Sequence, residues 1–111
     1  MPGSGLDIRL YPDTLRSIDS ATFTGSYQAV GSPLTYAARV IKFTNQSGVD
    51  VLVSWNGSTN HEIVPATGFF LLDVSANRET ANQCAIAAST QFYVKGAAST
   101  GLFYISVYYA M

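Results

Sequence analysis

The feature that most constrains this chain is its division into short β-favouring segments that each end in a turn. Val51, Val53 and Trp55 point one way if residues 50–55 form a strand, and Asn56-Gly57 directly after them is a strong hairpin signal. No stretch carries apolar residues at the i, i+3, i+4, i+7 spacing together with helix caps. The pattern therefore predicts an all-β fold, a single-domain β-sandwich resembling a jelly roll, with about eight strands.

The expected strands follow one another from residue 20 to the C-terminus. We expect Trp55, Phe43, Phe69 and Phe103 in the core. The dense apolar run 69–74 predicts a strand that is buried on both faces. The expected strands occupy residues 20–30, 34–44, 50–55, 61–64, 69–74, 82–88, 91–95 and 102–110.

Residues 1–19 differ from the rest, and we interpret them as an N-terminal arm that precedes a sandwich domain over residues 20–111. Leu6, Ile8 and Leu10 alternate with polar residues and would share one face of a strand, with Tyr11 next to them. A single strand cannot bury such a face alone. It either adds to the sheet edge of a neighbouring molecule or packs as an ordinary first strand of its own domain.

The last expected strand divides its side chains between two faces. If Phe103, Ile105 and Val107 line the core, Tyr104 and Tyr108 form a tyrosine stripe that faces outward. Tyrosine is favoured at interfaces because it combines a large apolar area with a hydroxyl group. A contact with a partner protein, ordinary packing and a platform for a glycan all remain open for this stripe.

The chain has too little charge to cover its surface in the usual way. Only 12% of its residues are charged, against 48% that are hydrophobic, whereas soluble domains carry about 25% charged residues. We therefore expect part of its surface to be covered by a partner. The six basic residues are scattered among seven acidic ones, which argues against nucleic acid as a ligand. The N-terminus does not resemble a signal peptide, and no apolar run approaches the ~20 residues that span a bilayer, so we expect no membrane partner.

The inventory of reactive residues predicts no catalytic residue, no metal site and no cofactor. His61 is the only histidine and Cys84 the only cysteine, too few for a site that needs several converging ligands. We expect His61 in an exposed turn and Cys84 packed as a small apolar residue. Asp73 ends an apolar run, and we interpret it as a strand-end residue that bonds nearby amides. The chain is therefore not expected to be an enzyme.

The order of several segments resembles small structural proteins of tailed bacteriophages. The whole chain looks like the decoration proteins, also called cement or stapling proteins, on the heads of short-tailed phages. The resemblance covers about two-thirds of the chain and specifies a β framework without a site. The segments are Ile41-Lys42-Phe43-Thr44-Asn45, Val51-Leu52-Val53-Ser54-Trp55-Asn56-Gly57, Ile63-Val64-Pro65-Ala66, Phe70-Leu71-Leu72-Asp73, Phe92-Tyr93-Val94-Lys95-Gly96 and Gly101-Leu102-Phe103-Tyr104-Ile105-Ser106-Val107-Tyr108.

The resemblance implies a protein that is made in the host cytoplasm, binds the exterior of the capsid and bridges neighbouring subunits of the major capsid protein. It also implies a homo-oligomer, a dimer or a trimer, with the dimer favoured. From the residues themselves, Leu6, Ile8, Leu10, Tyr11, Tyr104 and Tyr108 are the candidates for the partner interface. A tail or neck protein and a module that binds carbohydrate or a receptor are the alternatives.

Overall fold

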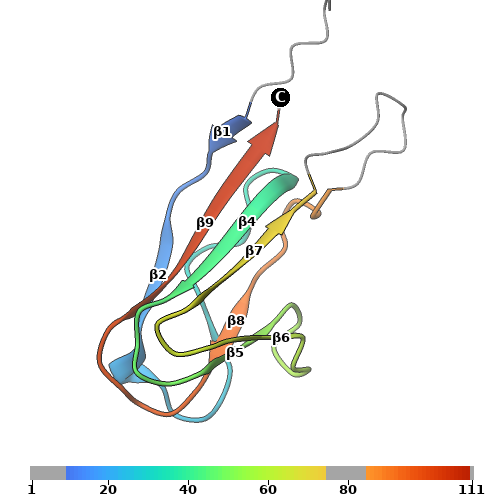
Figure 1. Cartoon of the computed structure of the whole chain (residues 1–111). Coiled ribbons are helices and arrows are strands. Elements are labelled where there is room, and N and C mark those ends of the chain that lie inside the picture. The colour runs from blue at the N-terminus through green and yellow to red at the C-terminus, as the bar shows by residue number, and fades with distance from the viewer. Residues whose placement is uncertain (1–9, 75–84, 111) are drawn as a thin grey trace, which may run out of the picture.

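A computed structural model describes residues 10–74 and 85–110 of the chain. In this part the chain forms nine strands and no α-helix. The strands form two antiparallel sheets that pack against each other (Figure 1). The prediction of an all-β sandwich is confirmed.

The larger sheet has five strands in the order β1-β9-β4-β7, with β2 also paired to β9. Because β1 pairs with the C-terminal end of β9 and β2 with its N-terminal end, β1 and β2 together make one interrupted edge strand. On its other side the larger sheet ends at β7, which pairs with β4 alone. The strands are β1 (Leu10–Pro12), β2 (Arg16–Asp19), β4 (Ala38–Asn45), β7 (Phe69–Asp73) and β9 (Leu102–Ala110).

The smaller sheet has four strands in the order β3-β8-β5-β6. If β1 and β2 count as one strand, each sheet contains four strands, and the chain crosses repeatedly between the sheets. This is the strand order of a jelly roll. The strands are β3 (Gln28–Ala29), β5 (Val51–Ser54), β6 (Glu62–Val64) and β8 (Tyr93–Lys95).

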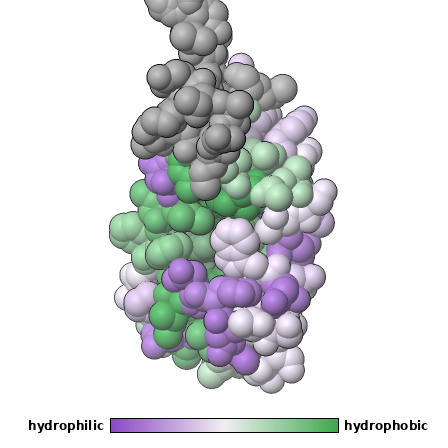
Figure 2. All heavy atoms as spheres, turned by 90° about the vertical axis from the view of Figure 1, so that its right-hand side faces the viewer, coloured by the Kyte–Doolittle hydropathy of each residue, from purple (hydrophilic) through white to green (hydrophobic). Residues whose placement is uncertain are grey.

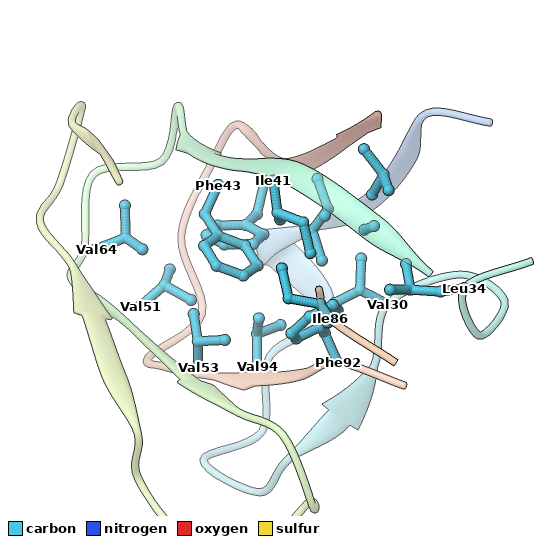
Figure 3. Close-up of a cluster of buried hydrophobic side chains, with 14 of the residues drawn as sticks. Val30, Leu34, Ile41, Phe43, Val51, Val53, Val64, Ile86, Phe92 and Val94 are labelled. Atoms are coloured by element: carbon cyan, nitrogen blue, oxygen red, sulfur yellow. The ribbon is translucent and has the colours of Figure 1, made fainter. Parts of the chain in front are cut away.

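The core lies between the two sheets, where their inward-facing side chains meet (Figure 3). Phe43 on β4 is completely buried and packs edge-on against Phe92, with 5.3 Å between the ring centroids. Phe103 on β9 is also completely buried and stacks on Phe43 at 6.2 Å. The predictions of Phe43 and Phe103 as core residues are confirmed.

Two other predicted core residues lie at the surface. Phe69 is 62% exposed, and Leu71 on the same side of β7 is 50% exposed. The prediction that residues 69–74 are buried on both faces is therefore wrong, because each sheet of a sandwich has one covered face and one open face. Trp55 follows the last residue of β5 and is 37% exposed, with one edge of its ring system against Phe92. Its prediction as a core residue is also wrong.

The stretch 20–30, predicted as one strand, is instead a turn followed by a short strand. Residues Ser20–Thr22 form a 3-10 turn, and the Asp19 carboxylate accepts a hydrogen bond from the Ala21 N–H at 3.0 Å. Gly25 then adopts a positive φ of 86° before β3 begins. Of the predicted strand 82–88, the described residues contribute an isolated bridge between Ile86 and Ala38, and Cys84 lies outside the described residues.

The described part of the predicted arm belongs to the domain's own sheet. Residues 10–12 and 16–19 pair with β9, as an ordinary first strand of the domain would. Leu6 and Ile8 lie outside the described residues.

Candidate protein-binding face

The outer face of the larger sheet is the side of that sheet that points away from the core. Residues that lie opposite each other on neighbouring strands share a face, so the strand register defines its members. Thr44 lies opposite both Tyr104 and Phe69, and the next row joins Ser106, Lys42 and Leu71. We call this surface the outer face, and its principal side chains are Leu10, Pro12, Leu15, Lys42, Phe69, Leu71, Tyr104 and Tyr108.

Large apolar side chains are exposed across the outer face, from one edge to the other. Leu15 is 56% exposed and Leu10 is 48% exposed at the interrupted edge, while Phe69 and Leu71 are exposed on β7. Figure 2 views the molecule from the side of β6 and the free edge of β7, where hydrophobic residues (green) gather in one area. No described segment covers the outer face, so this apolar surface meets solvent or a partner.

Charge on the outer face is sparse. In the register positions that face this side, the charged residues are Lys42, Asp73 and Asp19. The Lys42 ammonium lies 4.9 Å from the centroid of the Phe69 ring, within the range of a cation–π contact. A partner that approaches this face therefore has few ionic groups to desolvate, which favours an apolar contact.

A shallow hollow of about 140 Å³ indents the outer face where the edge strand is interrupted. Its lining is mixed: Leu15, Tyr108, Pro12 and Val107 are apolar, while Ser106 and the carboxylate residue Asp13 are polar. The hollow lies where residues 13–15 separate β1 from β2, although the Asp13 N–H still donates to the Val107 carbonyl of β9 at 2.8 Å. It offers a recess for an apolar side chain of a partner, the kind of pocket in which interface anchors are found.

A buried arginine fixes the interrupted edge strand to the sandwich. Arg16 is 4% exposed, and its guanidinium donates hydrogen bonds to the carbonyl oxygens of Ser32 at 2.7 Å, Thr14 at 2.8 Å and Pro33 at 2.9 Å. It also contacts the Asp13 carboxylate at 3.5 Å. Guanidinium suits this site because it presents several donors in one plane. Sequence reasoning missed this role, since an isolated arginine in a polar stretch carries no signal of burial.

Asp13 directly follows β1 and is the acidic partner of Arg16 in the interrupted edge strand. Burial alone would raise the pKa of Asp13, but the N–H groups of Thr14 and Thr35 and the charge of Arg16 lower it below its ordinary value. The Thr14 N–H donates to one carboxylate oxygen at 2.7 Å, and the Thr35 N–H donates to the other at 3.3 Å. The residue therefore remains ionised in the folded protein at neutral pH.

Three tyrosines gather on the opposite side of β9. Tyr109 lies between Tyr11 and Tyr36, with ring centroids 5.7 Å and 4.3 Å away. Partial desolvation raises the pKa of Tyr109, and the negative charges that Tyr36, Asp13 and Tyr11 can carry raise it further. The cluster holds β1 against residues 34–37, so Tyr11 has a packing role in this structure.

The structure separates the predicted interface residues into two groups. Leu10, Tyr104 and Tyr108 lie on the outer face, whereas Tyr11 lies on the other side with Tyr109. Tyr108 is 40% exposed and Tyr104 is half-buried. Phe103, Ile105 and Val107 are buried, as predicted. A role of Leu10, Tyr11, Tyr104 and Tyr108 in binding a partner stays a prediction.

Sequence reasoning missed the three exposed large apolar members of the outer face, Leu15, Phe69 and Leu71. The signal for the two on β7 was ambiguous, because a continuous apolar run fits a strand buried on both sides as well as an open edge strand.

The residues singled out for chemistry are not brought together. His61 is exposed, and its Nδ1 accepts a hydrogen bond from the Trp55 N–H at 3.0 Å, which closes the turn between β5 and β6. Asp73 is exposed at the end of β7. Among residues 10–74 and 85–110, no three His, Cys, Asp or Glu side chains converge as metal ligands would. In the same ranges, no helix has the length and apolar character needed to cross a bilayer.

Comparisons with known proteins add no relative. No protein-family model, no curated protein and no solved structure matches the chain.

Proposed function

We propose that this chain is a non-enzymatic structural protein of a phage particle that binds the outside of the capsid. In this proposal it bridges neighbouring subunits of the major capsid protein, is made in the host cytoplasm and ends up on the virion exterior. The observation that carries the proposal is the outer face, a sheet surface with many exposed apolar side chains and few charges.

A decoration protein needs a surface of this kind. It must bind many copies of a repeated partner without chemistry, and each apolar contact adds a modest free energy of about 25 cal/mol per Å² buried. A site that spans a boundary between subunits exists only in the assembled shell, so binding there stabilises the shell by mass action. The outer face offers such contacts at both edges of the larger sheet, around Leu15 and around Phe69.

The test is binding to phage heads in a sucrose gradient. The purified chain is mixed with heads that lack it, and the bound amount is compared with that of Leu15→Ser combined with Tyr108→Ser. Ile63→Ser serves as the matched control, because Ile63 is 52% exposed but lies on the smaller sheet. We expect a fixed stoichiometry that the double variant lowers at least tenfold and the control leaves unchanged.

Three results would contradict this proposal. The first is a chain that does not sediment with heads, and the second is a control variant that loses binding as strongly as the double variant. The third is a chain that binds purified tails in place of heads. The last result would favour a tail or neck protein.

Carbohydrate binding is a second candidate, and the exposure of Trp55 favours it. Trp55 lies at the start of the turn 55–61, which carries Asn56 and Asn60, and the Tyr27 hydroxyl donates a hydrogen bond to the Asn60 side chain. An exposed indole beside side-chain amides can stack on a sugar ring and bond its hydroxyls. A glycan array compares the chain with Trp55→Ala. Binding that disappears in the variant supports this function, and an empty array refutes it.

A further inference from the structure

The edge of the larger sheet at β7 has unsatisfied backbone groups. The Asn45 N–H donates to the Gly68 carbonyl at 2.9 Å, and the Val74 N–H donates to the Arg39 carbonyl at 2.7 Å. In an antiparallel ladder every second residue faces the neighbouring strand, so the residues that face β4 alternate from Gly68 to Val74. Phe69 and Leu71 have the opposite phase. Their N–H and C=O groups point away from β4, and no described residue bonds them.

The sequence of β7 does not protect this edge. Natural edge strands are usually blunted by a charged residue, a proline, a bulge or extreme shortness. The strand contains no proline and no bulge, and its one charged residue, Asp73, is at its very end, after four consecutive apolar residues. By contrast, β1 contains Pro12, β3 has two residues, and β6 has three residues and stops before Pro65. Among the described edges, β7 is therefore the one that can accept another strand.

We propose that two copies of this chain pair through β7 across a two-fold axis, which joins their larger sheets into one. In this register Phe69 of one copy lies opposite Leu71 of the other, and Leu71 lies opposite Phe69. Both residues use the N–H and C=O groups that point outward, so each pair exchanges both of its hydrogen bonds. Phe70 of each copy lies at the axis. The proposal rests on the edge of β7 and does not depend on capsid binding.

The strand is complementary to itself, which favours a second copy over a foreign strand. A two-fold contact requires that a surface match its own copy, and this register pairs an aromatic with an aliphatic side chain on the outer face at both positions. It also places Asp73 opposite Thr67, so the two carboxylates do not face each other. The two Lys42 residues are on strands three spacings apart, about 14 Å from backbone to backbone, and each ammonium lies over the Phe69 ring of its own copy.

The first test is the mass of the chain in solution, by light scattering and sedimentation equilibrium over a wide range of concentrations. We expect a dimer that dissociates on dilution. In Leu71→Pro the missing N–H faces outward, so the ladder with β4 is kept while one bond of each pair is lost. Because the change occurs in both copies, we expect the dissociation constant to rise at least about tenfold. Leu71→Lys, which adds a charge at the edge, should act in the same direction.

The matched control is Leu15→Lys. Leu15 is 56% exposed on the outer face but lies at the opposite side of the larger sheet, so this variant should dimerise like the original chain. A dimer that survives Leu71→Pro, or one that Leu15→Lys dissociates, overturns the proposal.

Hydrogen exchange of the original chain decides the matter if the Leu71 variants do not fold. The amides of Phe69 and Leu71 should exchange rapidly in dilute protein and slow at least tenfold when the dimer forms. A chain that stays monomeric at all concentrations refutes the pairing. Protection of these amides only after another protein is added refutes it too, and indicates strand addition by that protein.

Discussion

Removal of the Arg16 guanidinium should cost more stability than any other single change at the interrupted edge strand. Arg16→Met keeps the length of the side chain but removes the donors that hold the carbonyl oxygens of Ser32, Thr14 and Pro33. Hydrogen bonds from charged groups contribute about 1.5–3 kcal/mol each and are not additive. The carbonyls of Ser32 and Pro33 belong to exposed residues and can bond water instead. We therefore expect a loss of about 3–5 kcal/mol.

Urea unfolding followed by circular dichroism measures this loss. With a slope of about 1.5 kcal/mol per M, the midpoint should fall by about 2–3 M. The midpoint of Arg16→Lys should fall nearly as far, because one ammonium group cannot reach all the carbonyls that lie around a planar guanidinium. Ser17→Ala is the control, since Ser17 is an exposed neighbour on β2 and should change stability by less than about 0.5 kcal/mol.

A loss below about 1 kcal/mol for Arg16→Met would refute the reasoning. It would mean that the cost of burying the guanidinium offsets its bonds, and that β2 is held by the contacts of Ile18 with the core and by its ladder with β9.

Three further changes test the local structure, each with urea unfolding as the measurement. The folded state lowers the pKa of Asp13, so its stabilisation is complete above the unfolded pKa of about 3.9 and is lost as the pH falls through the folded pKa. Asp13→Asn should therefore reduce the loss of unfolding free energy that the original chain shows as the pH falls. An unchanged loss would contradict the role of Asp13. Asn45 is buried and donates to three main-chain carbonyls, so Asn45→Ala should cost about 2–3 kcal/mol. Asn56→Ala in the exposed turn should cost less, and equal losses would speak against this difference. Gly101 has a φ of 102°, and an added Cβ would lie 2.2 Å from a carbonyl oxygen. Gly101→Ala should therefore cost at least about 3 kcal/mol, against about 1 kcal/mol for Gly25→Ala, which meets no atom within 4 Å. Similar values for both would show that the backbone yields at Gly101.

The fold class could be predicted because the strand signals are local. Alternation around Val51 and Val53 marks a strand with one buried face, and both side chains are completely buried. The last strand was predicted over residues 102–110, which are the bounds of β9. Its division into inward and outward side chains follows from a period of two, so the exposure of Tyr108 was available from the sequence.

The position of a strand within its sheet could not be predicted. Whether Phe69 is buried depends on what lies above its sheet, and that depends on strand order, which no local pattern encodes. The same limit applies to Arg16, whose partners at Ser32 and Pro33 meet it only because β2 passes the loop before residue 34. The residues of the outer face could therefore be identified only from the strand register of the larger sheet.

The unequal edges of the larger sheet limit how far copies of this chain can associate. One edge is broken at residues 13–15 and contains Pro12, so it offers no continuous row of backbone groups to a further strand. Among the described strands of the larger sheet, β7 alone has an open edge, so the proposed pairing uses the one edge that can accept a strand. If the proposed pairing forms, the larger sheets end in a closed dimer and cannot extend into a fibre by adding further copies at their edges.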